Sequence, residues 1–323
     1  MTEPAEKLLD FSDLLTGAAE TPQIVAFLTA LNQRGITAAD LTALVKAMRA
    51  AALPFPPMPD AIDVCGTGGD GLDTPNISTA VALVVAGCGV PVVKHGNRAA
   101  SSRSGSADVL EALGVNLAAN SAAASMALAQ ANLCFLFARF YHPAMQHVAT
   151  ARKAIGERTI FNLAGPLANP AQPQRQLVGV YDRAWLIPVA EALRDLGSRH
   201  AWVVHSRDGM DELSTRAPSD VIRLKEGILT EDVINPEDYG LPCPPPDALR
   251  GGDAQENAAL IRALLTGATG PLQDIVSLNA GAALVIAEHA QTLGEGIALA
   301  RAAIRNGKAA NCLTQLIATT RQL

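Results

Sequence analysis

Apolar residues in the N-terminal part of the chain recur at the three- and four-residue spacing of helices. One helix is predicted between the N-cap residue Thr21 and Gly35, and a second begins after Thr37. Their apolar faces are formed by Ile24, Phe27, Leu28 and Leu31 in the first, and by Leu41, Leu44, Val45 and Met48 in the second. This pattern predicts a small helical domain at residues 1–58.

Residues 53–59 separate this unit from the rest of the chain, because closely spaced prolines disfavour helix and favour extended chain. Beyond them, short apolar strands alternate with helices, which predicts an α/β domain at residues 60–323 with a mostly parallel central sheet. Strands are predicted at 61–65, 90–93, 134–137, 176–180, 201–205 and 221–224, and helices at 79–86, 108–113, 185–196, 255–265, 279–288 and 294–306. The basic segment 138–170 interrupts the alternation, and we expect part of it to join the helical domain.

The composition excludes several classes of protein. Apolar residues make up 49% of the chain and charged residues 17%, which excludes intrinsic disorder. The net charge of −6 argues against nucleic acid as a partner. Neither a signal peptide nor a bilayer-spanning apolar stretch is recognisable, so no membrane partner is expected. The five cysteines are widely spaced without a Cys-x-x-Cys pair, which is typical of reduced thiols and predicts a cytoplasmic protein.

The first strand of the α/β region leads into the glycine-rich sequence GTGGDG at residues 66–71. Glycines let backbone N–H groups approach an anion closely, and the sequence NIST at 76–79 adds donors at a predicted helix N-terminus. The glycines also satisfy the G-x-G-x-x-G fingerprint of dinucleotide-binding proteins. However, Pro75 delays the helix, and Lys94 and His95 lie where a ribose-binding acid is expected. The context therefore favours phosphate binding and argues against a dehydrogenase.

A second donor-rich loop follows the next strand and has the sequence KHGNRAASSRSGS at residues 94–106. An isolated basic loop is usually a solvated surface feature, but here two consecutive strand–helix units end in such loops. The carboxyl ends of neighbouring parallel strands line one crevice. We therefore expect the two loops to converge on a ligand with two phosphate groups.

Adjacent carboxylates, Asp211 and Glu212, lie in the sequence DGMDELS at residues 208–214, shortly after a strand that ends at His205. Acidic residues are common at helix N-termini, but carboxylates together with phosphates also suit Mg²⁺. Because two phosphate loops need a counter-ion, we predict a Mg²⁺ site here. His205 is expected to be a satisfied strand-end histidine rather than a ligand.

Together these motifs resemble the anthranilate phosphoribosyltransferases of tryptophan biosynthesis. The resemblance lies in GTGGD at 66–70, NIST at 76–79, KHGNR at 94–98, HPAM at 142–145, RTIFNLAGPLANP at 158–170 and GMDELS at 209–214. It covers essentially the whole chain and implies a fold of the nucleoside phosphorylase/phosphoribosyltransferase type. It also implies transfer of the phosphoribosyl group from 5-phosphoribosyl 1-pyrophosphate (PRPP) to the amine of anthranilate. Two Mg²⁺ ions per subunit and a homodimer formed through the helical domain are further implications.

The resemblance implies roles for individual residues. PRPP would be held by Gly66, Gly69, Asp70, Thr74, Asn76, Ile77, Ser78, Thr79, Lys94, His95, Gly96, Asn97, Arg98, Ala99, Ala100, Ser101, Ser102 and Ser106. The metal ions would be held by Ser78, Asp211 and Glu212. Anthranilate would be bound by Gly66, Asn97 and Arg152, with His95 and Pro166 along its path. No general base is implied, and His95 is a candidate for positioning the acceptor.

Two residues depart from the family pattern. Pro75 stands where phenylalanine is usual, and Arg139 where proline is common. These two residues bear on the mobility of the donor loop and on the fit of the acceptor.

Two other interpretations of the function remain open. A pyrimidine nucleoside phosphorylase is disfavoured by KHGNR at 94–98 and by the Asp211–Glu212 pair, and a nucleic-acid-binding relative is disfavoured by the net charge of −6.

Overall fold

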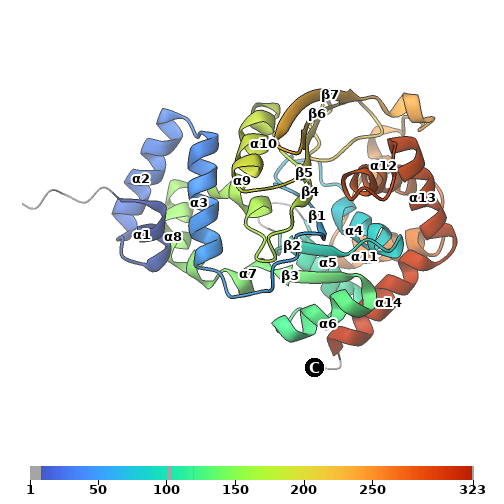
Figure 1. The fold of residues 1–323 in the computed structure, drawn as a ribbon, viewed down its shortest axis with the longest axis horizontal. Coiled ribbons are helices and arrows are strands. Elements are labelled where there is room, and N and C mark those ends of the chain that lie inside the picture. Colours follow the sequence, from blue (N-terminus) through green and yellow to red (C-terminus); the bar gives the residue numbers. More distant parts are fainter. Residues whose placement is uncertain (1–8, 100–102, 119, 322–323) are drawn as a thin grey trace, which may run out of the picture.

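The computed structural model describes residues 9–99, 103–118 and 120–321. Its centre is a seven-stranded sheet of order β3-β2-β1-β4-β5-β6-β7 (Figure 1). The strands are β1 (Ile62–Gly66), β2 (Val92–Gly96), β3 (Leu133–Phe137), β4 (Arg175–Gly179), β5 (His200–Ser206), β6 (Ser219–Lys225) and β7 (Ile228–Ile234). Strands β1 to β5 are parallel, and β6 and β7 join as antiparallel edge strands. The expected mostly parallel sheet is confirmed.

One face of the sheet is covered by the helices that follow the glycine-rich loops and by the C-terminal helices (Figure 1). They are α4 (Ile77–Gly87), α5 (Ser106–Leu113), α6 (Ser121–Ala131), α11 (Ala254–Leu265), α12 (Pro271–Ile286), α13 (Leu293–Arg305) and α14 (Lys308–Arg321). Helix α4 is apolar all round and almost entirely buried, as a helix packed between the sheet and further helices must be.

The other face packs against α10 (Leu186–Asp195), the short helix α9 (Phe161–Ala164) and the N-terminal helices. The latter are α1 (Phe11–Thr16), α2 (Thr21–Arg34) and α3 (Ala38–Ala50), which lie to one side in Figure 1. Helix α8 (Gln146–Ile155) packs against α1 and α2, and its Val148 and Ala151 belong to the same buried cluster as Leu28 and Leu44. Part of segment 138–170 thus lies beside the N-terminal helices, while the domain boundary near residue 58 stays a prediction.

Several elements differ from their predicted extents. Helix α12 begins at Pro271 rather than at residue 279, because Gly270 and Pro271 form a helix start that the apolar pattern alone did not show. Helices α6 and α14 and strand β7 were not predicted. Helix α6 is rich in alanine without a clear polar face, α14 has polar residues on either side of a buried apolar face, and β7 is an exposed edge strand. Among the described helices, none has the length and apolar character needed to cross a membrane.

The strand order places β1 between β2 and β4. The chain leaves β1 toward β2 on one side and returns to β4 on the other, so the connections diverge at β1. Ligands of open α/β sheets bind where connections diverge in this way, at the carboxyl ends of the strands. The glycine-rich loop after β1 and the basic loop after β2 both begin at this edge.

Candidate active site

The glycine-rich loop occupies residues 67–76, between the end of β1 and the start of α4. Gly69 and Gly71 have φ angles of 78° and 77°, in the left-handed region that glycine adopts without strain. The N–H of Gly68 donates to Oδ2 of Asp211 at 2.6 Å, so one of the predicted metal ligands closes the base of the loop. Helix α4 begins at Ile77, after Pro75, and this late start agrees with the argument against dinucleotide binding.

The acidic segment packs directly onto the ends of β1 and β4. A Cβ atom on Gly66 would lie 2.3 Å from Oδ2 of Asp211, and one on Gly179 would lie 1.4 Å from its carbonyl oxygen. Both strands therefore need glycine at their last position for Asp211 to lie against the sheet edge. The segment is a turn rather than a helix N-terminus, so a helix cap does not explain its acids.

Asp211 and Glu212 are nearly fully buried, at 8% and 9% exposure. Burial and the nearby Asp70 carboxylate raise the pKa of Asp211, and burial together with Asp211 raises the pKa of Glu212. Lys94 and the backbone N–H of Ser78 oppose the rise at Glu212. Two buried carboxylates whose charges are poorly compensated, beside the Ser78 hydroxyl, suit a hard cation that takes its other ligands from phosphate and water. The described residues contain no cluster of three or more His, Cys, Asp or Glu able to hold a metal ion unaided.

Lys94 connects the two loops beneath the site. Its side chain is buried, and its ammonium donates to the carbonyl of Val64 at 2.6 Å and to the Ser78 hydroxyl at 3.2 Å. Lys94 thus places positive charge under the glycine-rich loop, near Glu212. The hydroxyl of Thr79, the residue after Ser78 in the first turn of α4, is buried and without a hydrogen-bond partner in the described structure.

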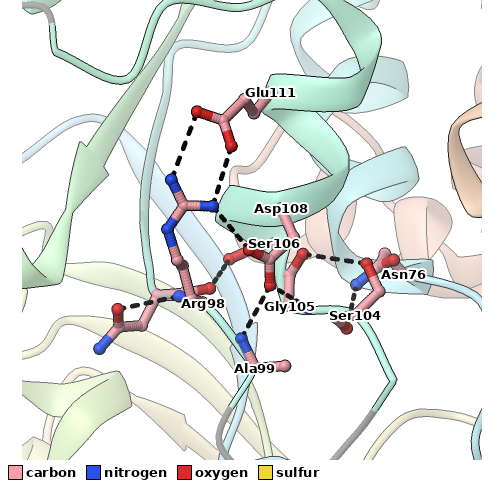
Figure 2. Close-up of polar contacts among 9 residues, drawn as sticks. Asn76, Arg98, Ala99, Ser104, Gly105, Ser106, Asp108 and Glu111 are labelled. Carbon is pink, nitrogen blue, oxygen red and sulfur yellow. Dashed lines mark hydrogen bonds and ion pairs between the residues drawn. The ribbon is translucent and has the colours of Figure 1, made fainter. Parts of the chain in front are cut away.

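The basic loop is held in shape by α5 (Figure 2). Arg98 donates to Asp108 and Glu111, while Oδ2 of Asp108 accepts from the N–H groups of Ala99 and Gly105 at 2.9 and 3.0 Å. The carbonyl of Asn97 accepts from the Ser106 hydroxyl at 3.3 Å. The Arg98 guanidinium is therefore engaged by carboxylates of α5. The predicted residues Ala100, Ser101 and Ser102 lie outside the described part of the chain.

Asn76 joins the two loops. Its amide donates to the carbonyl of Ser104 at 3.0 Å, and its oxygen accepts from Asn257 of α11 at 2.9 Å (Figure 2 shows the bond to Ser104). The neighbouring Pro75 is buried and contacts the segment at Gly251, where a Cβ atom would lie 2.7 Å from the proline nitrogen. Pro75 is thus part of a packed contact, whereas Arg139 is exposed on the short helix α7 (Ala138–Tyr141).

A histidine pair lies between β2 and the segment that links the two layers. The rings of His95 and His142 are 5.1 Å apart in an edge-to-face arrangement, and Nδ1 of His95 contacts the carbonyl of Gly165 at 3.2 Å. Burial, reinforced by the His142 ring, lowers the pKa of His95 to about 3. His95 is therefore a neutral imidazole near pH 7. Pro166, beside Gly165, is buried, and its carbonyl accepts from Gln176 at 3.1 Å.

Arg152 lies in the last turn of α8, with its guanidinium carbon 5.3 Å from the centroid of the Phe161 ring. Within the described ranges no carboxylate pairs with it, although burial lowers its pKa. An arginine that is largely buried and unpaired is a suitable partner for the carboxylate of a ligand. His205, in contrast, contacts the carbonyl of Val180 at 2.8 Å, as expected of a satisfied strand-end residue.

Sequence reasoning missed residues that support the site from below. Asp63 of β1 is fully buried, accepts from Asn169 at 2.8 Å and from the N–H of His95 at 3.3 Å, and has its pKa raised by burial to about 6. A carboxylate inside an apolar strand pattern was the one feature of the sequence that could have revealed it. Arg158 carries no such feature, because its partner is the backbone carbonyl of Gly69, far away in the chain. The contacts of Asp108 with Ala99 and Gly105 are made to backbone N–H groups, which leave no mark on the side-chain pattern.

Comparisons with known proteins agree with this geometry. Residues 58–310 match the model of the glycosyl transferase family a/b domain, and residues 11–52 match that of the glycosyl transferase family helical bundle domain. The anthranilate phosphoribosyltransferase of Parvibaculum lavamentivorans is 51% identical over 98% of this chain and 93% of that protein. The chain belongs to the anthranilate phosphoribosyltransferase family. The enzyme of Rhizobium meliloti is also 51% identical, over 95% of this chain and 91% of that protein.

Solved structures of the family superpose closely on this chain. Anthranilate phosphoribosyltransferase from Thermus thermophilus has a TM-score of 0.91 at 44% identity, covering 96% of this chain and 93% of that chain. The Saccharomyces cerevisiae enzyme in complex with PRPP and Mg has a TM-score of 0.87 at 27% identity, covering 97% and 91%. The same yeast enzyme in complex with 4-fluoroanthranilate has a TM-score of 0.86 at 26% identity, covering 97% and 91%.

Proposed function

We propose that this protein transfers the phosphoribosyl group of PRPP to the amine of anthranilate, giving N-(5-phosphoribosyl)anthranilate and pyrophosphate in tryptophan biosynthesis. The main support is that three features meet at one edge of the sheet in a member of this family. They are the glycine-rich loop, the end of β2 with Lys94, and the buried Asp211–Glu212 pair. Yeast relatives in complex with PRPP and Mg and with 4-fluoroanthranilate support both substrates.

PRPP is proposed to lie across the two loops. The N–H groups of the glycine-rich loop and the N-terminus of α4 face its phosphates, and Lys94 lies beneath them. The residues proposed to contact PRPP are those expected from the sequence. Among the described residues they are Gly66, Gly69, Asp70, Thr74, the NIST residues 76–79, Lys94 to Ala99 and Ser106. Because the Arg98 guanidinium binds Asp108 and Glu111, we assign its contribution to the loop backbone.

Asp211, Glu212 and Ser78 are proposed to hold Mg²⁺, with two ions per subunit. Their buried, poorly compensated carboxylates fit a divalent cation. When bound, Mg²⁺ neutralises charge on the pyrophosphate and so makes it a better leaving group. Asp211 also fixes Gly68, which couples the shape of the phosphate loop to this site.

Anthranilate is proposed to enter on the side of α8. Arg152 binds its carboxylate, Asn97 and Gly66 contact it, and His95 and Pro166 line its path. The amine then attacks C1 of the ribose, so that a C–N bond forms while the C–O bond to pyrophosphate breaks and pyrophosphate leaves with the electron pair. The attacking nitrogen loses one proton to water or to the departing pyrophosphate. A neutral His95 positions the acceptor, because a group with a pKa of about 3 is a poor base at neutral pH. Catalysis thus rests on alignment and electrostatic stabilisation of the leaving group.

This function is tested by incubating the protein with PRPP, Mg²⁺ and anthranilate and measuring the decrease in anthranilate fluorescence. A decrease that requires the protein, PRPP and Mg²⁺ supports the proposed function. No loss at saturating concentrations, combined with phosphorolysis of a pyrimidine nucleoside, would instead identify a nucleoside phosphorylase.

We further propose a homodimer formed through the helical domain and a cytoplasmic location, with residues 1–58 as that domain. The dimer and the location rest on the family resemblance. The domain bounds rest on the sequence pattern, and α8 packs against α1 and α2 of the same layer. Light scattering after gel filtration should give a mass twice the 33.5 kDa of the chain, and a value of one chain would contradict the dimer.

A further inference from the structure

Arg158 reaches the glycine-rich loop from the opposite layer of the molecule. It lies between α8 and α9, and its Nη2 donates to the carbonyl of Gly69. Its guanidinium carbon is 3.8 Å from the centroid of the Tyr181 ring, close enough for a cation–π contact. Within the described ranges, no carboxylate pairs with this arginine. The exposed guanidinium is thus held between an aromatic ring and a loop carbonyl.

This contact sets the direction of a loop peptide. A trans peptide points its C=O and N–H in opposite directions, so a Gly69 carbonyl that faces Arg158 turns the N–H of Asp70 away from Arg158. The N–H groups of Gly69, Asp70 and Gly71 have no acceptor among the described residues. They are therefore free to meet the oxygens of an anion, as in other loops of successive N–H groups.

The loop is tied to the same arginine at a second point. The N–H of Tyr181 donates to the Thr67 hydroxyl at 3.0 Å, so the ring that stacks on Arg158 is itself anchored to the start of the loop. On the other side, the backbone carbonyl of Arg158 accepts from the amide of Asn32 in α2 at 2.8 Å. Arg158 therefore connects the helical layer with the loop.

We propose that Arg158 is a positioning residue that holds the Gly69–Asp70 peptide in the orientation needed to bind the phosphates of PRPP. The proposal rests on the proposed function and deepens it by assigning a role to a residue outside the predicted substrate and metal sets. Arg158 acts through the loop, without contacting the reacting atoms. Its loss weakens donor binding and leaves acceptor binding intact.

The test compares Arg158→Gln and Arg158→Lys with the unchanged protein. Calorimetric binding of PRPP with Mg²⁺, KM for each substrate, and the melting temperature are measured for each variant. We expect Arg158→Gln to raise Kd and KM for PRPP about tenfold, with KM for anthranilate and the melting temperature nearly unchanged. Arg158→Lys should recover only part of this loss, because an ammonium donates to Gly69 but does not form the planar stack on Tyr181. Arg194→Gln, on the exposed side of α10, is the matched control and should change none of these values.

A second pair of variants tests the stacking contact. Tyr181→Leu should raise Kd for PRPP in the same direction as Arg158→Gln, and Tyr181→Phe should raise it less, because the ring is kept. Unchanged PRPP binding in Arg158→Gln, or an equal loss of affinity for both substrates, would overturn the proposal. If the unchanged protein binds PRPP but does not consume anthranilate, the proposed function fails, and the calorimetric comparison alone still decides the role of Arg158.

Discussion

At the scale of single residues, the site consists of charged groups that are buried before any ligand arrives. Lys94 is buried near Asp63 and Glu212, and burial raises the pKa of both carboxyl groups. Arg152 is largely buried without a carboxylate partner in the described ranges. Buried charges that lack full compensation are costly to a folded protein, and such groups concentrate at functional sites.

Replacing Arg152 should affect the acceptor alone. Arg152→Gln removes a charged, two-pronged donor, whose hydrogen bonds to a carboxylate contribute about 1.5–3 kcal/mol, or about 10- to 150-fold in affinity. We expect KM for anthranilate to rise by this factor, with KM for PRPP nearly constant in steady-state assays. Lys153→Gln, the exposed neighbour in α8, is the control. A rise in KM for PRPP of the same size would contradict the assignment.

The neutral state of His95 predicts a pH-dependent contribution to stability. Its folded pKa of about 3 lies below the ordinary value of 6.5, so only the unfolded chain takes up this proton as the pH falls from 6.5 toward 3. His95 therefore lowers the free energy of unfolding over that range, by about 2 kcal/mol at pH 5. Urea unfolding of the unchanged protein and of His95→Asn at pH 7 and pH 5 isolates this effect. Equal losses on acidification in both proteins would show that His95 titrates normally.

At the scale of elements, close contacts between backbones decide where glycine is needed. Helices α12 and α13 touch at Gly281 and Gly296, where a Cβ atom on Gly296 would lie 2.4 Å from the Gly281 carbonyl oxygen. The same kind of contact places Asp211 against Gly66 and Gly179 at the sheet edge. Neither contact follows a short sequence motif, since Gly281 and Gly296 lie on two different helices and Asp211 is far along the chain from Gly66.

Two glycines of α13 provide a matched comparison. Gly296→Ala should destabilise the protein by about 1–3 kcal/mol, because its methyl group overlaps the Gly281 backbone. Gly294→Ala meets nothing within 4 Å and should stabilise it by up to about 1 kcal/mol, since alanine favours helix. Denaturant unfolding of both variants checks the opposite signs. Two variants of equal stability would mean that α12 and α13 do not touch as described.

At the scale of the whole molecule, the substrates should couple to folding because the site joins segments far apart in the chain, from residue 66 to residue 212. A ligand at 100 times its Kd stabilises the folded state by about 2.7 kcal/mol, so PRPP with Mg²⁺ should raise the melting temperature. Asp211→Asn should remove the part of this shift that depends on Mg²⁺, while the asparagine oxygen still accepts from Gly68. Thermal unfolding of both proteins with PRPP, in the presence and absence of Mg²⁺, measures the Mg²⁺-dependent part of the shift in melting temperature. An undiminished Mg²⁺-dependent shift in the variant would exclude Asp211 as a metal ligand.

Much of the fold was predictable because it is encoded locally. Alternating strands and helices and glycine-rich strand ends are patterns within short segments, and the mostly parallel sheet followed from them. Helix α6 was missed because its alanine-rich sequence shows no clear polar face. Helix α14 carried a usable pattern, since its buried Ala309, Cys312, Leu313 and Leu316 follow helical spacing, but the prediction did not use it. Both helices are stabilised by packing, because neighbouring elements bury one side of each, including Ala127 of α6 and Leu316 of α14.

The sequence by itself determined which chemical groups are present and which short segments carry them: the GTGGDG loop, the KHGNR strand end and the adjacent carboxylates. Their order along the chain also sufficed to indicate the family. Only the tertiary structure decided how these groups are held: Asp211 against Gly66, Lys94 beneath Ser78, Arg98 turned toward α5, and Arg158 on the carbonyl of Gly69. The physical reason is that these contacts join residues of different elements, some of them far apart in sequence, and many involve backbone groups that every residue carries.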